Sequence, residues 1–162
     1  MESFFSYEFH KVLGTTIDVC TQRVHDFFAS NIFRNNVEPL EGAIEALKNL
    51  SRRFEIHCVT ARQLQYEDLT KMWLKKHFGD NVISEVHFGN HYCKPGEKSR
   101  KKSEICTSIG AVALVDDSYK YAKDCAKAGI PVFLFGDYGW NRIPESESIV
   151  LDEELYISIS LL

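Results

Sequence analysis

Two adjacent carboxylates, Asp116 and Asp117, directly follow the apolar run at residues 111–115. Carboxylate oxygens are the ligands that hard cations prefer, and Mg²⁺ is commonly held by one or two of them together with water and a substrate phosphate. We therefore regard the pair as a candidate Mg²⁺ site. The alternative is that Asp117 caps the helix predicted to follow, and both roles are compatible if one acid caps while the other faces a ligand.

A hydroxyl and cationic side chains lie where they could support a phosphoryl group. Thr60 ends a β-rich run and is followed by Ala61 and Arg62, and Lys102 lies near the start of a predicted helix. Hydrolysis of a phosphate monoester needs a nucleophile, positive charge and hydrogen-bond donors for the phosphoryl oxygens. Thr60, Ala61, Arg62 and Lys102 are therefore candidate phosphate-binding residues. Taken singly, a structural threonine and a solvated lysine are the ordinary alternatives.

Two histidines four residues apart, His87 and His91, raise the question of a zinc site. No third ligand follows at a suitable spacing, so hydrogen bonding within the loop is favoured over metal ligation. A glycine-rich phosphate loop is absent, and no local motif indicates a serine or cysteine nucleophile.

Short apolar runs alternate with helical segments from residue 55 onward, and this order predicts βαβ units with a parallel sheet. The strands are expected at residues 55–60, 85–88, 111–115 and 131–135, and the helices at 66–78, 101–109 and 119–128. Continuous apolar runs are typical of strands buried on both faces. Ligands in such sheets bind at the carboxyl ends of the strands, where Thr60 and Asp116 are placed.

The two ends of the chain lack the alternation of strands and helices predicted for the middle. Residues 1–39 are predicted to be helical, with an apolar face over residues 17–28, and Pro39 is predicted to open the next helix. Residues 148–151 and 156–161 are predicted strands. In the second, Ile157, Ile159 and Leu161 alternate with serines, which is typical of a half-exposed strand.

Length and composition limit the class of protein. A chain of 162 residues with 44% hydrophobic and 26% charged residues fits one globular domain, and a net charge of -4 gives no electrostatic footprint for nucleic acid. Its five widely spaced cysteines favour buried reduced thiols in a reducing compartment. No secretory signal and no run of membrane-spanning length is present. We expect a soluble cytoplasmic protein, with an organelle interior as the alternative, and no nucleic-acid or membrane partner.

The order of these segments resembles the haloacid dehalogenase (HAD) superfamily, in particular its 5′-deoxyribonucleotidase C-type branch. The likeness is carried by residues 39–43, 59–62, 102–106 and 114–117, and it extends from about Tyr7 to Arg142. It implies a three-layer, Rossmann-like α/β fold with a parallel sheet. It also implies that residues 1–38 are the remnant of a helical cap and residues 39–162 the α/β core.

The resemblance implies a role for each candidate residue. Thr60 would hold the phosphoryl group, Lys102 would be the family's lysine, and Asp116 and Asp117 would bind Mg²⁺. The family's first motif is Asp-x-Asp at the end of the central first strand, where the first Asp is the nucleophile and the second the general acid/base. No such motif is found in this sequence, so no catalytic residue is assigned.

The aspartates that precede Thr60 are Asp18 and Asp26, which both fall in a predicted helix and have no acid two residues on. The resemblance therefore implies a fold truncated at its N-terminus, with weakened Mg²⁺ binding. Without the central strand, a gap of roughly 10 Å would separate the strands ending at Thr60 and Asp116. Those strands could pair directly, the C-terminal strand could extend the sheet, or a second chain could donate a strand. We favour a homodimer or edge addition, because serines in the tail do not suit a central strand.

Two functions from different classes remain open. The first is a pseudophosphatase that binds a phosphate-bearing small molecule or protein partner and has a binding or regulatory role. The alternative is a Mg²⁺-dependent phosphomonoesterase, nucleotidase-like, whose first motif lies in a longer form. A third possibility is a truncated product with no selected role.

Overall fold

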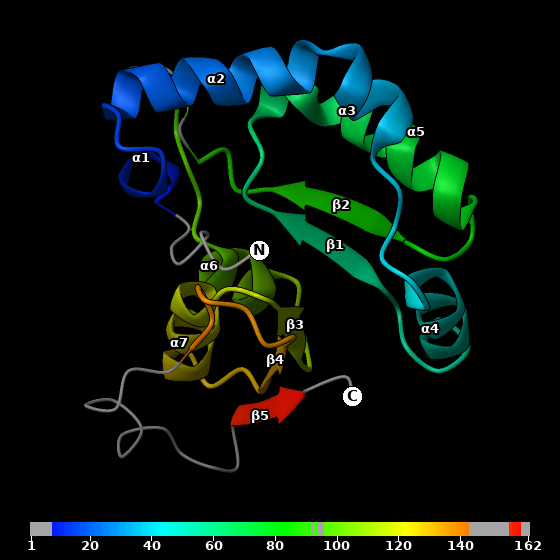
Figure 1. The fold of residues 1–162 in the computed structure, drawn as a ribbon. Coiled ribbons are helices and arrows are strands. Elements are labelled where there is room, and N and C mark those ends of the chain that lie inside the picture. The colour runs from blue at the N-terminus through cyan, green and yellow to red at the C-terminus, as the bar shows by residue number, and fades with distance from the viewer. Residues whose placement is uncertain (1–7, 92, 94–95, 143–155, 160–162) are drawn as a thin grey trace. The chain divides into compact units, whose positions relative to one another are not determined.

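The structure is a computed structural model that describes residues 8–91, 93, 96–142 and 156–159 (Figure 1). It confirms the predicted α/β class, with parallel strands connected by helices. The chain forms two compact units, one made of Thr21–Arg100 and the other of Met1–Cys20 with Lys101–Leu162. The predicted boundary between residues 38 and 39 falls inside the first unit. The strands form two separate sheets, and the division into a cap remnant and an α/β core stays a prediction.

The unit Thr21–Arg100 is built around one βαβ arrangement. Its elements are α2 (Ile17–Ala29, which begins in the other unit), α3 (Asn31–Asn36), α4 (Ala43–Leu50), β1 (His57–Thr60), the 3-10 turn η1 (Leu64–Tyr66), α5 (Glu67–Phe78) and β2 (Glu85–Phe88). Strands β1 and β2 pair in parallel, with His57 opposite Glu85 and Thr60 opposite Phe88. The predicted strand 85–88 matches β2, and Thr60 ends β1 as predicted.

Local sequence sets the helix ends in this unit. Ser30 caps α3 by accepting a 3.2 Å hydrogen bond from the Phe33 N–H, so the N-terminal helical region is interrupted there. The helix predicted over residues 66–78 ends at Phe78 as α5, where Gly79 follows with φ of 80°. The prediction that Pro39 opens a helix is wrong. The helix α4 begins at Ala43, because Gly42 before it adopts a left-handed conformation with φ of 75°.

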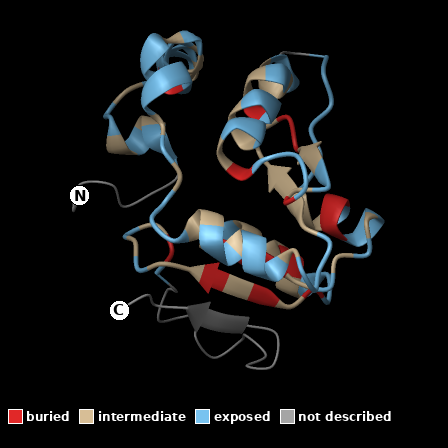
Figure 2. Ribbon diagram, turned by 90° about the vertical axis from the view of Figure 1, so that its right-hand side faces the viewer, coloured by how far each residue is buried: buried red, intermediate tan, exposed pale blue. Residues whose placement is uncertain are grey.

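An aromatic cluster forms much of the core of this unit. Phe33 is 2% exposed and makes an edge contact with Phe28, with ring centroids 4.9 Å apart. Phe28 also contacts Tyr66 at 4.7 Å, which joins α2 to η1. Elsewhere in the unit the Trp73 indole donates a 2.6 Å hydrogen bond to the Val37 carbonyl. Figure 2 shows the buried residues of the chain in red.

The other unit contains a second βαβ arrangement and a third strand. Its elements are α1 (Phe9–Val12), α6 (Lys102–Ser108), β3 (Leu114–Asp116), α7 (Tyr119–Lys127), β4 (Val132–Phe135) and β5 (Tyr156–Ile159). The sheet order is β3-β4-β5 and both pairings are parallel. Helix α7 packs against α6, β3 and β4. The core side chains are Ile105, Cys106, Leu114, Ala122, Cys125, Ile130, Val132 and Leu134.

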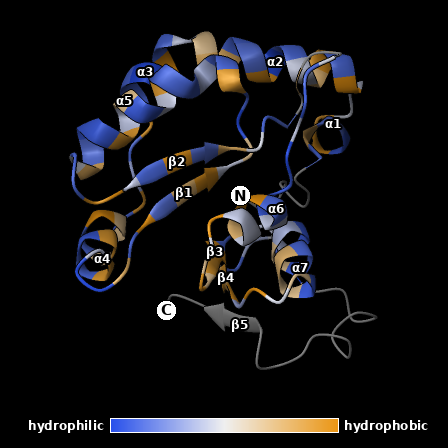
Figure 3. Ribbon diagram, turned by 180° about the vertical axis from the view of Figure 1, so that it is seen from behind, coloured by the Kyte–Doolittle hydropathy of each residue, from blue (hydrophilic) through white to orange (hydrophobic). Residues whose placement is uncertain are grey.

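The predicted strand 111–115 is observed as the shorter β3, and it is buried on one face only. Leu114 and Asp116 are buried, whereas Val115 between them is 59% exposed and Val112 is 74% exposed. The prediction of burial on both faces is therefore wrong for β3. Packing by α7 covers one face, and the described residues leave the face of Val115 open. Figure 3, coloured by hydropathy, shows that β3 and β4 consist largely of hydrophobic residues.

The C-terminal strand extends the sheet at its edge, as one of the predicted repairs requires. Strand β5 pairs with β4 in parallel, on the side of β4 opposite β3. Strands β1 and β3 lie in different sheets, so direct pairing between them is not observed among the described strands. The predicted strand at residues 148–151 and the last residues of the tail strand lie outside the described residues. The homodimer stays a prediction.

None of the five cysteines, all of which lie among the described residues, forms a disulfide. The expected burial of the thiols holds for three of them. Cys20, Cys106 and Cys125 are buried, and Cys58 and Cys93 are half-buried. A hydrogen bond with Cys125 lowers the pKa of the Cys106 thiol, and the same contact together with burial raises the pKa of Cys125.

Candidate functional site

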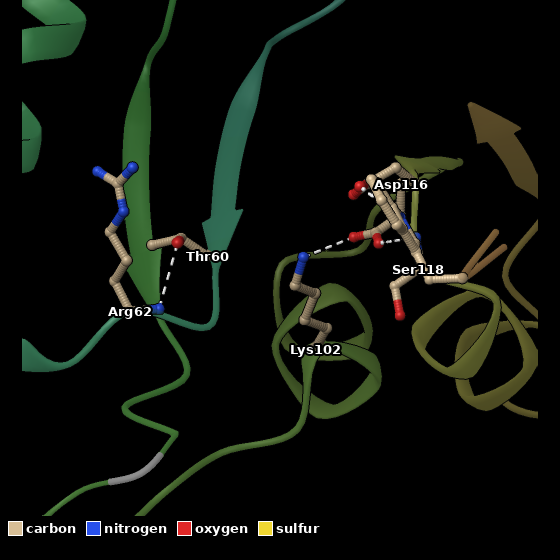
Figure 4. Close-up of polar contacts among 7 residues, drawn as sticks. Thr60, Arg62, Lys102, Asp116 and Ser118 are labelled. Atoms are coloured by element: carbon tan, nitrogen blue, oxygen red, sulfur yellow. Dashed lines mark hydrogen bonds and ion pairs between the residues drawn. The ribbon is translucent and has the colours of Figure 1, made fainter. Parts of the chain in front are cut away.

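Asp116 ends β3, and both of its carboxylate oxygens have partners (Figure 4). The Lys102 ammonium lies 2.5 Å from Oδ2, and the Ser118 N–H donates a 2.9 Å hydrogen bond to Oδ1. The side chains of Asp116 and Lys102 are 4% and 12% exposed. The two predicted site residues therefore form one buried ion pair at the carboxyl end of the strand.

Lys102 is positioned by α6 and α7 together. It is the first residue of α6, whose opening turn is closed by Glu104 accepting a 3.1 Å hydrogen bond from the Lys101 N–H. Its ammonium also lies 4.6 Å from the centre of the Tyr121 ring on α7, an arrangement that favours a cation. Tyr121 was not predicted as a site residue, because its contact depends on how α7 packs beside α6.

Burial dominates the electrostatics of this pair. It raises the pKa of Asp116 above its ordinary value, while the Lys102 ammonium and the Ser118 N–H oppose that rise. The charged form of Asp116 therefore depends on Lys102. Loss of that cation would leave a buried carboxyl group with only the backbone donor of Ser118 to stabilise its charge.

Asp117 directly precedes Ser118, which is the N-cap residue of α7. The Asp117 Oδ2 accepts a 3.2 Å hydrogen bond from the Trp140 indole, in a loop that follows β4. The N-cap position that the alternative gave to Asp117 is therefore held by Ser118. Trp140 lies five residues beyond Phe135, the last residue of that strand, and only its place after a strand end could have drawn attention to it.

Loop 136–142 is folded around Asn141, which is 4% exposed. The Asn141 amide donates to the carbonyls of Phe135 and Gly136 at 2.9 and 2.8 Å, and its oxygen accepts from the Tyr138 N–H at 2.9 Å. Tyr138 stacks on Trp140 with ring centroids 4.6 Å apart. This network holds the Trp140 indole in place beside Asp117.

In the other unit, Thr60 ends β1 and begins a tight loop. Its hydroxyl oxygen accepts a 3.2 Å hydrogen bond from the Arg62 N–H. The Arg62 guanidinium donates to the Thr70 hydroxyl at 3.1 Å and lies 5.0 Å from the centre of the Phe33 ring. Burial lowers the pKa of Arg62. The guanidinium is thus held in the aromatic core of its unit, and a phosphate-binding role for Arg62 stays a prediction.

The backbone of loop 60–62 is joined to loop 89–91. The N–H groups of Gly89, Asn90 and His91 donate to the carbonyls of residues 60, 62 and 61 at 2.7, 3.1 and 3.0 Å. Asn90 has a positive φ of 52° and is 3% exposed. Its amide bonds the Lys98 carbonyl and the Leu64 N–H, both at 3.1 Å. The carbonyls of residues 60–62 therefore face the neighbouring loop.

His91 behaves as the loop alternative predicts. Its Nε2 lies 3.0 Å from the Arg100 carbonyl oxygen, within hydrogen-bonding distance. His87 is instead 3.0 Å from His57 on the neighbouring strand. The structure thus joins Lys102 to Asp116 in one unit and Thr60, Ala61 and Arg62 in one loop of the other.

The acidic pair has the donor type that Mg²⁺ requires, since Asp116 ends β3 and Asp117 directly follows it, and both carry carboxylate oxygens. Lys102 already neutralises one of those carboxylates, so a cation at Asp116 would share it with the lysine. Asp18 and Asp26 do not add to this set. Both are exposed on α2, and the Asp26 carboxylate accepts a 2.8 Å hydrogen bond from Gln22 within the same helix.

Residues 4–120 match the protein family described as "5' nucleotidase, deoxy (Pyrimidine), cytosolic type C protein". The match includes Thr60, Lys102, Asp116 and Asp117 and covers more than half of the 162 residues. No curated protein matches the chain. Among the described residues, no helix has the length and apolar character needed to cross a bilayer.

Proposed function

Because the chain belongs to the cytosolic type C 5′-nucleotidase family of HAD-like proteins, we propose that it binds a phosphate monoester beside Lys102 and Asp116 without hydrolysing it. The observation that carries this proposal is the position of the aspartates that precede Thr60. Asp18 and Asp26 are both exposed on helix α2, and neither ends a strand. The sequence contains no Asp-x-Asp motif at any position.

The absence of that motif removes the family's chemical step. A phosphoryl group can pass through an aspartyl-phosphate only when a carboxylate oxygen attacks phosphorus and the leaving alcohol receives a proton. Asp116 is poorly suited to attack, because its two oxygens are engaged by Lys102 and the Ser118 N–H. This chain is therefore expected to retain the residues that bind phosphate and to lack the one that breaks the ester.

Charge in the site favours joint binding of phosphate and a cation. Lys102 supplies an ammonium that can bond phosphoryl oxygens, but Asp116 and Asp117 bring two carboxylates to the same strand end. Asp116 and Asp117 would hold Mg²⁺, which supplies positive charge for the phosphoryl oxygens. A dianionic phosphate without that charge would meet a net negative site, so we expect its binding to be weaker.

Titration calorimetry with thymidine 5′-monophosphate, a ligand suggested by the family description, tests the proposal. We expect the affinity to rise at least about tenfold when Mg²⁺ is present, which corresponds to about 1.4 kcal/mol. Lys102→Arg should retain part of that binding because the positive charge remains, and Lys102→Met should lose it. Lys101→Met removes an exposed neighbouring lysine and is the matched control.

Two outcomes would count against this proposal. One is binding that is equally strong in the Lys102→Met variant, measured at a temperature where circular dichroism shows that the variant is folded. The other is binding that Mg²⁺ does not change. Either result would show that the nucleotide does not bind at the ion pair at the end of β3.

A second candidate is a Mg²⁺-dependent phosphomonoesterase of the nucleotidase type, whose first motif lies in a longer form of the protein. The family match supports it, since the family is described as a nucleotidase. It predicts that a longer chain with a hydrophobic strand ending in Asp-x-Asp before Met1 hydrolyses nucleotides.

A phosphorylated protein partner and a homodimer are further proposals, and sedimentation analysis with and without Mg²⁺ tests the dimer.

A further inference from the structure

Three side chains that can bind a metal ion lie together on β1 and β2, outside the site described above. They are His57, Glu85 and His87. The parallel register pairs His57 with Glu85, and His87 lies two residues beyond Glu85 on the same strand. Side chains two residues apart point to the same face of a sheet, so all three share one face of the β1–β2 pair.

The spacing of the ligand atoms matches a small coordination sphere. His57 Nδ1 lies 3.0 Å from His87 Nε2, and Glu85 Oε2 lies 3.6 Å from the same His87 nitrogen. One ligand atom from each residue lies within 4.8 Å of the others. Bonds of about 2.0 to 2.1 Å at tetrahedral angles place neighbouring ligands of Zn²⁺ about 3.3 Å apart. The observed separations fall on either side of that value.

The surroundings of the histidines suit a bound ion. Their side chains are 21% and 13% exposed, whereas Glu85 is 65% exposed and can admit an ion from solvent. The second nitrogen of His57, Nε2, lies 3.5 Å from a Glu55 carboxylate oxygen. A carboxylate on the far nitrogen fixes the orientation of a metal-bound imidazole and increases its basicity. Glu55 therefore occupies the place of a positioning residue for His57.

We propose that His57, Glu85 and His87 bind one Zn²⁺ ion across β1 and β2, with Glu55 positioning His57 and the fourth coordination position open to water. Imidazole ligands distinguish this site from Asp116 and Asp117, whose carboxylates suit Mg²⁺. A two-stranded sheet is weakly stable by itself, and a shared ion would hold β1 beside β2. The ion would thereby also support the loop that begins at Thr60.

The metal-free explanation of the cluster is a hydrogen bond between the two imidazoles with the two glutamates nearby. Both explanations use the same residues but differ in one measurable property, which is affinity for Zn²⁺. The proposal does not depend on phosphate binding, since its residues belong to a different strand pair from Lys102 and Asp116.

Competition with a chromogenic zinc chelator tests the site in the full chain, after removal of metals with EDTA and in excess Mg²⁺. We expect one tightly bound Zn²⁺ per chain. At about 100 times the dissociation constant, Zn²⁺ should raise the unfolding temperature by roughly 5 to 10 °C. His87→Gln should weaken binding at least about tenfold, since loss of even an indirect partner costs that much. Glu85→Gln, at an exposed position, should weaken binding without affecting folding.

His91→Gln is the matched control, because His91 lies four residues from His87 and bonds the Arg100 carbonyl instead. It should bind Zn²⁺ as the unmodified chain does. Replacement of Zn²⁺ by Co²⁺ adds a spectroscopic test, since cysteine ligands give an intense thiolate charge-transfer band that this site should lack. Equal affinity in His87→Gln and the unmodified chain, equal loss in His91→Gln, or a thiolate band would each overturn the proposal.

Discussion

Lys102→Met is expected to lower the free energy of unfolding by about 3 kcal/mol. The Lys102 and Asp116 side chains are 12% and 4% exposed, so the substitution leaves a carboxylate buried without its cation. Burial already raises the pKa of Asp116, and removal of Lys102 takes away one of the groups that oppose the rise. Denaturant unfolding at neutral pH, followed by circular dichroism, measures the effect.

A second substitution separates the lost ion pair from lost packing. Asp116→Asn keeps an oxygen that can accept from the Ser118 N–H, so the double variant Lys102→Met/Asp116→Asn should recover most of the lost stability. Lys101→Met, at the exposed neighbouring lysine, should change stability by less than about 0.5 kcal/mol. A single Lys102→Met variant as stable as this control would show that the buried pair has no structural role.

Phe33→Ala is expected to lower the free energy of unfolding by more than Lys102→Met does, by about 4 kcal/mol. Phe33 is 2% exposed and makes edge contacts with Phe27 and Phe28, with ring centroids 5.4 and 4.9 Å apart. Its ring also lies 5.0 Å from the Arg62 guanidinium, so the substitution removes packing and a cation–π contact together. Thermal and denaturant unfolding of the purified variant give the change in stability.

Ile32 provides the comparison for Phe33, because it is the neighbouring residue on the same helix and is 64% exposed. Ile32→Ala should cost less than about 0.5 kcal/mol. The loss of stability in Phe33→Leu should lie between those of Ile32→Ala and Phe33→Ala. Leucine keeps apolar volume but lacks the ring that contacts the Arg62 guanidinium. Equal destabilisation by Phe33→Ala and Ile32→Ala would contradict the assignment of Phe33 to the core of this unit.

The strand ends that carry the site could be predicted from local sequence. Thr60 follows a short β-rich run and Asp116 follows a continuous apolar run, and the structure ends β1 and β3 at those residues. The end of the helix predicted over residues 66–78 was also correct, and the glycine that follows it has the positive φ that favours glycine. The family resemblance added Lys102, whose contact with Asp116 spans 14 residues of sequence.

Contacts set by tertiary packing could not be predicted in this way. The Trp140 indole reaches Asp117 because Asn141 folds the loop after β4, and no local pattern encodes that fold. The pairing of His57 with His87 requires the register of two strands that lie 30 residues apart in the chain. The exposure of Val115 could not be predicted either, since an apolar run does not reveal which face of the strand a helix will cover.

The central claim is that this chain binds a phosphate monoester but leaves the ester bond intact, and phosphorus NMR of thymidine 5′-monophosphate with the protein and Mg²⁺ tests it most directly. We expect the nucleotide resonance to shift or broaden on binding and to keep its intensity, with no inorganic phosphate formed over hours. Steady release of inorganic phosphate by the unmodified chain, abolished by Asp116→Asn, would contradict the claim and identify this chain as an active phosphatase.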